Sequence, residues 1–281
     1  MIRSLLFALL ALALSSCQEM LFITKTYPPE IETNNDTARV IIMNRFDYNS
    51  ANYIKDKNQE VYKAGVDQFS MQLLSLGRGQ DVHYEALNSL YYTGPGKLTL
   101  QLPPDSVISL CSRNGADMLL TVDSLQIYFD WETIVEDDGA SKSKTKNFYL
   151  HEDVFLTVYS SAGINLNRSR VGRSMLYKSR PTLSGLITFQ PSLPKAIDEV
   201  KILSTDCATE FNEKFYPLTQ EEPRMIYSGK KFRESNKVIK SGDYTRAGEL
   251  LREMITTSGG NLATKARHNL IVVQEAMESK K

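Results

Sequence analysis

The sequence predicts an α+β protein in which helices pack against a mixed β-sheet, followed by a small all-helical region. Candidate strands and amphipathic helices alternate up to residue 222, whereas only short helical patterns follow. The composition is that of a globular protein, with 42% hydrophobic residues and 33 Lys+Arg against 33 Asp+Glu. At about 150 residues per domain, such a chain forms one large domain or two modest ones.

The expected sheet region begins with a strand and a helix. Residues 39–46 are a continuous apolar run, which is typical of a buried strand. Apolar side chains that recur every three or four positions predict one helix face, formed by Val61, Gly65, Phe69, Leu73 and Leu76. A second strand is expected at residues 82–87, and the next helix should start at Pro103 and stop at Gly115.

The middle of the chain predicts antiparallel strands. Residues 118–131 alternate as in a long strand with one face in water. Residues 132–146 are charged and lack apolar periodicity, so we expect an exposed loop there. Gly163 supplies the turn of a predicted hairpin between residues 154–159 and 164–168.

A further strand and a long helix complete the expected domain. The strand is expected at residues 183–189, and the helix runs from Pro194 to Pro217 with its apolar side chains on one face. The order strand-helix-strand-helix-strand-strand-strand-helix predicts a layered α+β domain over residues 39–222.

The first 16 residues have the pattern of a secretory signal peptide, with the basic Arg3 before a short apolar run. The run ends in Leu14-Ser15-Ser16-Cys17, which resembles the lipobox of bacterial lipoproteins. In that family the cysteine carries fatty acyl chains such as palmitate, so Cys17 would anchor the chain to a membrane. Residues 17–38 contain Tyr27-Pro28-Pro29 and the polar run of residues 32–36, a composition that predicts a lipidated tether. The alternative is an ordinary signal peptide with a cysteine beside it by chance.

Residues 223–281 predict a basic helical tail, with 12 Lys+Arg and 6 Asp+Glu. Within it, Gly242-Asp243-Tyr244 followed by Ala247 resembles the turn of a tetratricopeptide repeat. The resemblance is partial, because Ser235 and Val238 stand where the first helix of such a repeat has Gly and aromatic residues. One repeat cannot bury its own apolar face, so we expect this hairpin to pack against the α+β domain, against another copy of the chain or against a partner.

Taken with the lipobox, the predicted order of elements resembles the amino-terminal domain of the translocation protein TolB. It is also similar to the curli-channel and penicillin-binding-protein-activator lipoproteins. With its helical tail, the chain resembles a lipoprotein family of gut Bacteroidota that joins these two parts. The resemblance implies a TolB-like α+β fold, envelope assembly without catalysis, and O-glycosylation at Asp-Ser/Thr-apolar triplets. Of the matching triplets, the one at Thr37 lies in the expected tether.

Motifs that carry chemistry are missing from the sequence. The three histidines, His83, His151 and His268, are too far apart in sequence to predict a metal site, and no nucleophile elbow or phosphate-binding glycine loop occurs. We therefore predict no catalytic residues, no metal and no cofactor. Cys111 and Cys207 lie on predicted apolar helix faces and are expected to be core residues, although a disulfide between them is an alternative.

Two surface features are candidates for binding. Arg168, Arg170 and Arg173 follow the hairpin turn and could meet an anionic glycan or an acidic partner; a solvated strand face is the alternative. A balanced net charge argues against nucleic acid as a partner.

These observations favour a non-enzymatic lipoprotein of the bacterial cell envelope that binds another envelope protein. We expect the anchor in the outer membrane and the protein facing the periplasm. A glycan- or lipopolysaccharide-binding module is the first alternative, and a hydrolase whose site is assembled from distant residues is the weaker one.

Overall fold

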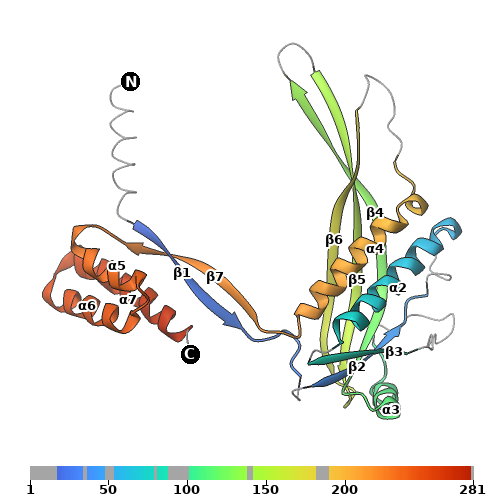
Figure 1. The fold of residues 1–281 in the computed structure, drawn as a ribbon, viewed down its shortest axis with the longest axis horizontal. Helices are drawn as coiled ribbons and strands as arrows, with labels where there is room; N and C mark the ends of the chain where they lie inside the picture. The colour runs from blue at the N-terminus through green and yellow to red at the C-terminus, as the bar shows by residue number, and fades with distance from the viewer. Residues whose placement is uncertain are drawn as a thin grey trace. The chain divides into compact units, whose positions relative to one another are not determined.

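The computed structural model describes residues 18–33, 37–47, 54–78, 81–87, 101–137, 142–181 and 190–279 (Figure 1). They form two compact units. One consists of the chain up to residue 28 together with residues from 217 onward, and the other of residues 29–216. The α+β class predicted from the sequence is confirmed. No helix within the described ranges is long and apolar enough to cross a membrane.

The larger unit is built on a five-stranded mixed sheet with the order β3-β2-β4-β5-β6 (Figure 1). Strand β2 runs parallel to both of its neighbours, β3 and β4, whereas β4, β5 and β6 are antiparallel. The strand bounds are β2 Ala38–Asn44, β3 Val82–Ala86, β4 Met118–Asp137, β5 Lys142–Ser160 and β6 Asn165–Pro181.

Helices cover both faces of this sheet at β2. Val40 and Ile42 are buried with the helices α2 (Gln59–Leu76) and α4 (Ile197–Glu213). Ile41 and Met43 are buried with α3 (Pro104–Asn114) instead. Because successive residues of a strand point to opposite faces, α3 lies across the sheet from α2 and α4. Two short 3-10 helices precede α2 and α4, namely η1 Asp56–Asn58 and η2 Leu193–Lys195.

The smaller unit combines a two-stranded ribbon with three helices. Strand β1 (Gln18–Tyr27) pairs antiparallel with β7 (Leu218–Tyr227) over its whole length. The other elements are η3 Lys230–Phe232, α5 Arg233–Lys240, α6 Tyr244–Thr257 and α7 Gly260–Glu278. Ile23 of β1 and Ile226 of β7 are buried in one core with side chains of all three helices. Arg224 of β7 also donates two hydrogen bonds to Glu275 of α7, at 2.9 and 2.8 Å.

The structure differs from the sequence prediction at both ends of the α+β region. Residues 18–27, expected as a tether, form a strand, and the change of unit falls at residue 217 rather than 223. Apolar and polar residues alternate poorly along the sequence of β1, because Met20 and Phe22 are apolar although their side chains lie exposed on its outer face. Its partner strand is about two hundred residues away in the sequence, so no local sequence pattern can predict that the two strands pair.

Most other element predictions agree with the structure, and one does not. Gly163 has the positive φ (79°) that the β5–β6 turn requires. The expected loop at residues 132–146 is largely strand, since β4 extends to Asp137 and β5 starts at Lys142. Cross-strand pairing compensates there for the lack of an apolar pattern. The strand expected at residues 183–189 lies outside the described residues.

Candidate functional site

The tetratricopeptide-like turn has the local geometry that its sequence predicts. Gly242 adopts a positive φ of 81°, and Asp243 caps α6 by accepting a hydrogen bond from the backbone N–H of Arg246 at 3.0 Å. Tyr244 opens α6, and Ala247 is fully buried against α5 and α7 side chains. The apolar face that the sequence left uncovered is covered by the chain's own β1–β7 ribbon. This hairpin therefore gives no argument for a partner.

The three arginines proposed for binding do not form one patch. Arg168 and Arg170 lie two residues apart on β6 and share a face, as expected. Arg173 forms an ion pair with Glu210 of α4 at 2.9 Å. Val171, two residues earlier and therefore on the same face of β6, is buried in the core with side chains of that helix. Arg173 consequently lies on the helix-covered face of the sheet, opposite Arg170.

Arg170 is held by a carboxylate of the neighbouring strand. Its Nε and Nη2 donate to the two oxygens of Asp153, at 2.9 and 2.8 Å, in the bidentate geometry typical of strong Arg–carboxylate pairs. Gly172 lies opposite Asp153 in the register, and a Cβ at Gly172 would come within 2.4 Å of the Asp153 carboxylate. Because glycine has no side chain, Gly172 leaves space for the ion pair between Asp153 and Arg170.

An aromatic pair lies next to this ion pair. The Tyr128 ring stacks on His151 of the adjacent strand, with centroids 4.9 Å apart and planes 6° from parallel. Together with Asp153, Arg170, Gly172, Arg173 and Ser174, this pair lines a shallow cavity of about 350 Å³. Arg173 thus borders the same cavity as Arg170, although its guanidinium forms an ion pair with Glu210 of α4. A flat ring beside a fixed guanidinium is chemistry that suits a sugar or a peptide. Arg170 is a candidate from the sequence, whereas Asp153, Tyr128 and His151 carry no sequence signal for this site, because only strand register brings them together.

A second polar cluster anchors the end of β2 to β4. Asp123, at a bulge in β4, accepts hydrogen bonds from Arg45 at 3.0 Å and from the hydroxyls of Thr121 and Thr157 at 2.9 and 2.5 Å. Both oxygens of the Asp123 carboxylate therefore accept hydrogen bonds. The arrangement satisfies a largely buried charge and has a structural role.

Glu152 is a buried carboxyl group beneath α4. Its Oε1 accepts a hydrogen bond from Ser204 at 2.7 Å, and its Oε2 has no hydrogen-bond partner within the described residues. Burial raises the pKa of Glu152 to about 8, so the group is mainly protonated at neutral pH. No sequence pattern predicts this burial, because a single Glu between strand residues is usually a solvent-facing position.

The two described cysteines are free thiols in separate cores. Cys111 of α3 is buried on one side of the sheet and Cys207 of α4 on the other, so the disulfide considered from the sequence does not form. Burial raises the pKa of the Cys111 thiol to about 11 and that of Cys207 well above its usual range. In the part of the chain that the structure describes, no group of three His, Cys, Asp or Glu side chains could hold a metal ion.

Strand β4 has a long edge that its neighbours do not cover. Strand β2 pairs with β4 only from Met118 to Val122. Farther along, the Tyr62 hydroxyl meets both backbone polar groups of Ile127, and Gln190 donates to the carbonyl of Phe129. Within the described ranges, no strand pairs with the same edge from residue 130 to residue 137.

This free edge, residues 130–137 of β4, carries outward backbone groups and exposed apolar side chains. Backbone groups alternate in direction along a strand, so those of Trp131, Thr133 and Val135 point the same way as those of Ile127. Trp131 is 51% and Val135 54% exposed, and Lys146 of β5 lies over the Trp131 ring at 4.4 Å. Exposed edges of this kind accept strands from other chains.

Comparisons with known proteins add little to this description. No protein-family model matches the chain, and a search of curated proteins finds no match. Among solved structures, the chain is similar to the crystal structure of a neuraminyllactose-binding hemagglutinin homolog from Helicobacter pylori, with 13% sequence identity and a TM-score of 0.34. The match covers 67% of this chain and 90% of that chain. A likeness this distant carries no argument about function.

Proposed function

We propose that this protein is a non-enzymatic, membrane-anchored lipoprotein of the cell envelope that binds another envelope protein as an assembly factor. The anchor is Cys17 in its lipobox context, which lies outside the described residues, and the proposed location is the periplasmic side of the outer membrane. Thr37, which is exposed just before β2, remains the proposed O-glycosylation site.

The observation that carries the proposal is the free edge of β4. Its partner would be an extended segment of another protein that pairs with the outward backbone groups of Thr133 and Val135 and packs on the exposed side chains. The Trp131 N–H already donates to Asp130 Oδ1 at 2.7 Å, so Trp131 offers only its carbonyl. Acidic residues, among them Asp130 and Glu136, flank these positions and favour a partner segment with Lys or Arg.

Crosslinking in cells tests the partner. The variant Trp131→Ser with Val135→Ser removes the apolar contacts of the free edge and should abolish a crosslinked species that the unaltered chain gives. The matched control is Ile164→Ser with Leu166→Ser, which removes apolar side chains that are 61% and 41% exposed elsewhere in the same unit. Equal crosslinking by both variants contradicts the proposed docking edge.

The lipid anchor needs its own test. Labelling with a palmitate analogue should mark the unaltered protein in membrane fractions, whereas Cys17→Ser should remove the label and release the protein from the membrane. A label that persists in Cys17→Ser, or a soluble unaltered protein, would contradict lipid attachment at this residue.

A second candidate function is recognition of an anionic glycan at the cavity beside Asp153 and Arg170. The stacked Tyr128 and His151 rings support it, because rings beside a fixed guanidinium can hold a charged sugar. Tyr128→Ala with Arg170→Ala should abolish salt-sensitive binding to lipopolysaccharide, while Trp131→Ser with Val135→Ser should leave it unchanged. The opposite pattern would exclude this cavity.

A further inference from the structure

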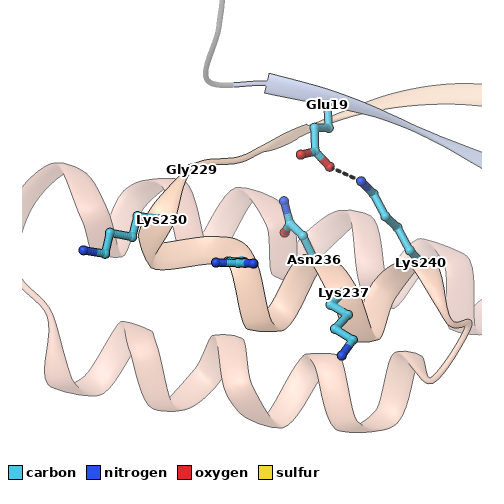
Figure 2. Close-up of a pocket in the computed structure, with 7 residues that line it drawn as sticks. Glu19, Gly229, Lys230, Asn236, Lys237 and Lys240 are labelled. Atoms are coloured by element: carbon cyan, nitrogen blue, oxygen red, sulfur yellow. Dashed lines mark ion pairs between the residues drawn. The ribbon is translucent and has the colours of Figure 1, made fainter.

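A basic cavity lies in the smaller unit, beside the start of β1. It has a volume of about 600 Å³ and is lined by Glu19, Gly229, Lys230, Arg233, Asn236, Lys237 and Lys240 (Figure 2). All these residues belong to one compact unit. Four of the seven carry a positive charge and one a negative charge, so the cavity favours an anion.

Most of these positive charges are not engaged within the protein. Lys240 forms an ion pair with Glu19 at 2.7 Å (Figure 2). Lys230, Arg233 and Lys237 form no ion pair with another described residue, and their side chains are exposed. Three uncompensated cations line one hollow, and Figure 2 shows Lys230 and Lys237 extended in different directions. Their long side chains would turn inward to meet the acceptor oxygens of a phosphate group.

Asn236 gives a second, independent sign of a ligand. The residue is only 4% exposed, and its Nδ2 donates to the carbonyl of Tyr227 at 3.1 Å. Its Oδ1 is buried and has no hydrogen-bond partner within the described residues. Buried polar atoms are nearly always paired, so this acceptor is suited to a donor that enters the cavity, such as a hydroxyl or an ammonium group.

The position of the cavity in the chain indicates where the phosphate comes from. Gln18, the first described residue, pairs with Tyr227, and Glu19 lines the cavity two residues after Cys17. An acyl chain on Cys17 would therefore hold the membrane surface close to this cavity. Lipid headgroups combine a phosphate with a hydroxyl or ammonium group a few bonds away, which matches the cations and the unpaired Asn236 oxygen.

We propose that this cavity binds the phosphate headgroup of a membrane lipid next to the anchor, with Lys230, Arg233 and Lys237 contacting the phosphate and Asn236 Oδ1 accepting from the headgroup. The inference rests on the proposed lipid anchoring at Cys17. The site would orient the smaller unit on the membrane, because an acyl chain alone leaves the protein free to rotate.

Vesicle binding tests this site without the anchor. Residues 18–281, which include every described residue, should bind vesicles of phosphatidylcholine with phosphatidylglycerol and not vesicles of phosphatidylcholine alone. Arg233→Gln with Lys237→Gln should lower the partition coefficient by about 30-fold, since two basic contacts with an anionic surface are lost. The matched pair Arg252→Gln with Arg267→Gln removes two exposed cations from α6 and α7 and should leave binding unchanged.

Competition distinguishes a lipid headgroup from free phosphate. At matched ionic strength, glycerol 3-phosphate should displace the protein from vesicles at lower concentration than inorganic phosphate, because it also donates a hydroxyl to Asn236. Equal losses in both variant pairs would overturn the site in favour of unspecific charge attraction, and equal displacement by both anions would overturn a headgroup site. Failure of acyl labelling at Cys17 would instead contradict the proposed function, and the vesicle result would remain valid.

Discussion

At the residue scale, buried polar side chains fix positions that apolar packing leaves open. Asn269, fully buried on α7, accepts a hydrogen bond from the backbone N–H of Tyr227 at 2.7 Å and donates to its carbonyl at 2.9 Å. Asn269 thus pairs with both backbone groups at the end of β7, and the carbonyl also accepts from Asn236 at 3.1 Å. The Asn therefore attaches the ribbon to the helices.

Loss of this side chain should weaken the smaller unit. Asn269→Ala is expected to lower the free energy of unfolding by about 2 to 4 kcal/mol, because it removes two hydrogen bonds and leaves buried backbone groups with fewer partners. Chemical denaturation followed by circular dichroism measures the change. Asn261→Ala, at an exposed position of the same helix, should change the value by less than about 0.5 kcal/mol. Equal effects would contradict this role of Asn269.

Glu152 should give the larger unit a characteristic pH dependence. Its pKa in the folded protein is about 8, above the usual 4.5, so the native state holds a proton that the unfolded chain releases between these values. The free energy of unfolding should therefore fall as pH rises from about 4.5 to about 8. Fluorescence of Trp131, the single tryptophan, follows unfolding of this unit.

The variant Glu152→Gln tests this assignment. It cannot ionise, so this part of the fall with rising pH should disappear. Glu132→Gln, which alters an exposed carboxylate on β4, should retain the fall. A pH profile that is the same in the unaltered chain and in Glu152→Gln would show that another group is responsible.

At the element scale, close approach of backbones requires a glycine at the end of α2. Gly77 ends α2, and a Cβ there would lie 2.8 Å from the Tyr84 nitrogen and 2.9 Å from the Val82 oxygen of β3. Neither backbone atom can move without disturbing the parallel pairing of β3 with β2. The residue therefore sets how closely α2 passes over the sheet edge.

Gly77→Ala should destabilise the larger unit by about 1 to 3 kcal/mol through this overlap. Thermal unfolding followed by Trp131 fluorescence measures the effect. The control is Gly259→Ala, where an added Cβ meets nothing within 4 Å and φ is −110°. A Gly77→Ala variant as stable as the unaltered protein would contradict the close approach.

At the scale of the whole molecule, the unit boundary decides which truncations are informative. A chain that ends at Glu222 would keep only half of β7 and leave the first half of β1 without its partner. A chain of residues 29–216 contains the complete larger unit. We expect it to fold alone and to show the Trp131 fluorescence and the Glu152 pH dependence of the full chain.

Truncation at Glu222 should behave differently from this matched fragment. Its half-unpaired β1 exposes Leu21 and Ile23, which the smaller core covers in the full chain, so we expect aggregation that light scattering detects. If residues 29–216 also aggregate, the larger unit depends on the smaller one for stability, contrary to the division described above.

The sequence by itself determined the local elements, because each of them depends on neighbours within a few residues. Periodicity located α2 and α4, and Gly163 and Gly242 located two turns that have positive φ. Ala247, which belongs to the partial tetratricopeptide resemblance, is buried in the structure. The Cys17 motif is likewise a purely local signal and remains a prediction.

The tertiary structure alone decided how distant segments meet. It pairs residues 18–27 with residues 218–227, separates Arg173 from Arg170 by the plane of the sheet, and places Asp153 beside Arg170. Strand register determines each of these contacts, and a shift of one residue would reverse every side chain. Sequence patterns show that a residue faces inward or outward, but not which distant partner it meets, and the proposed surfaces depend on those partners.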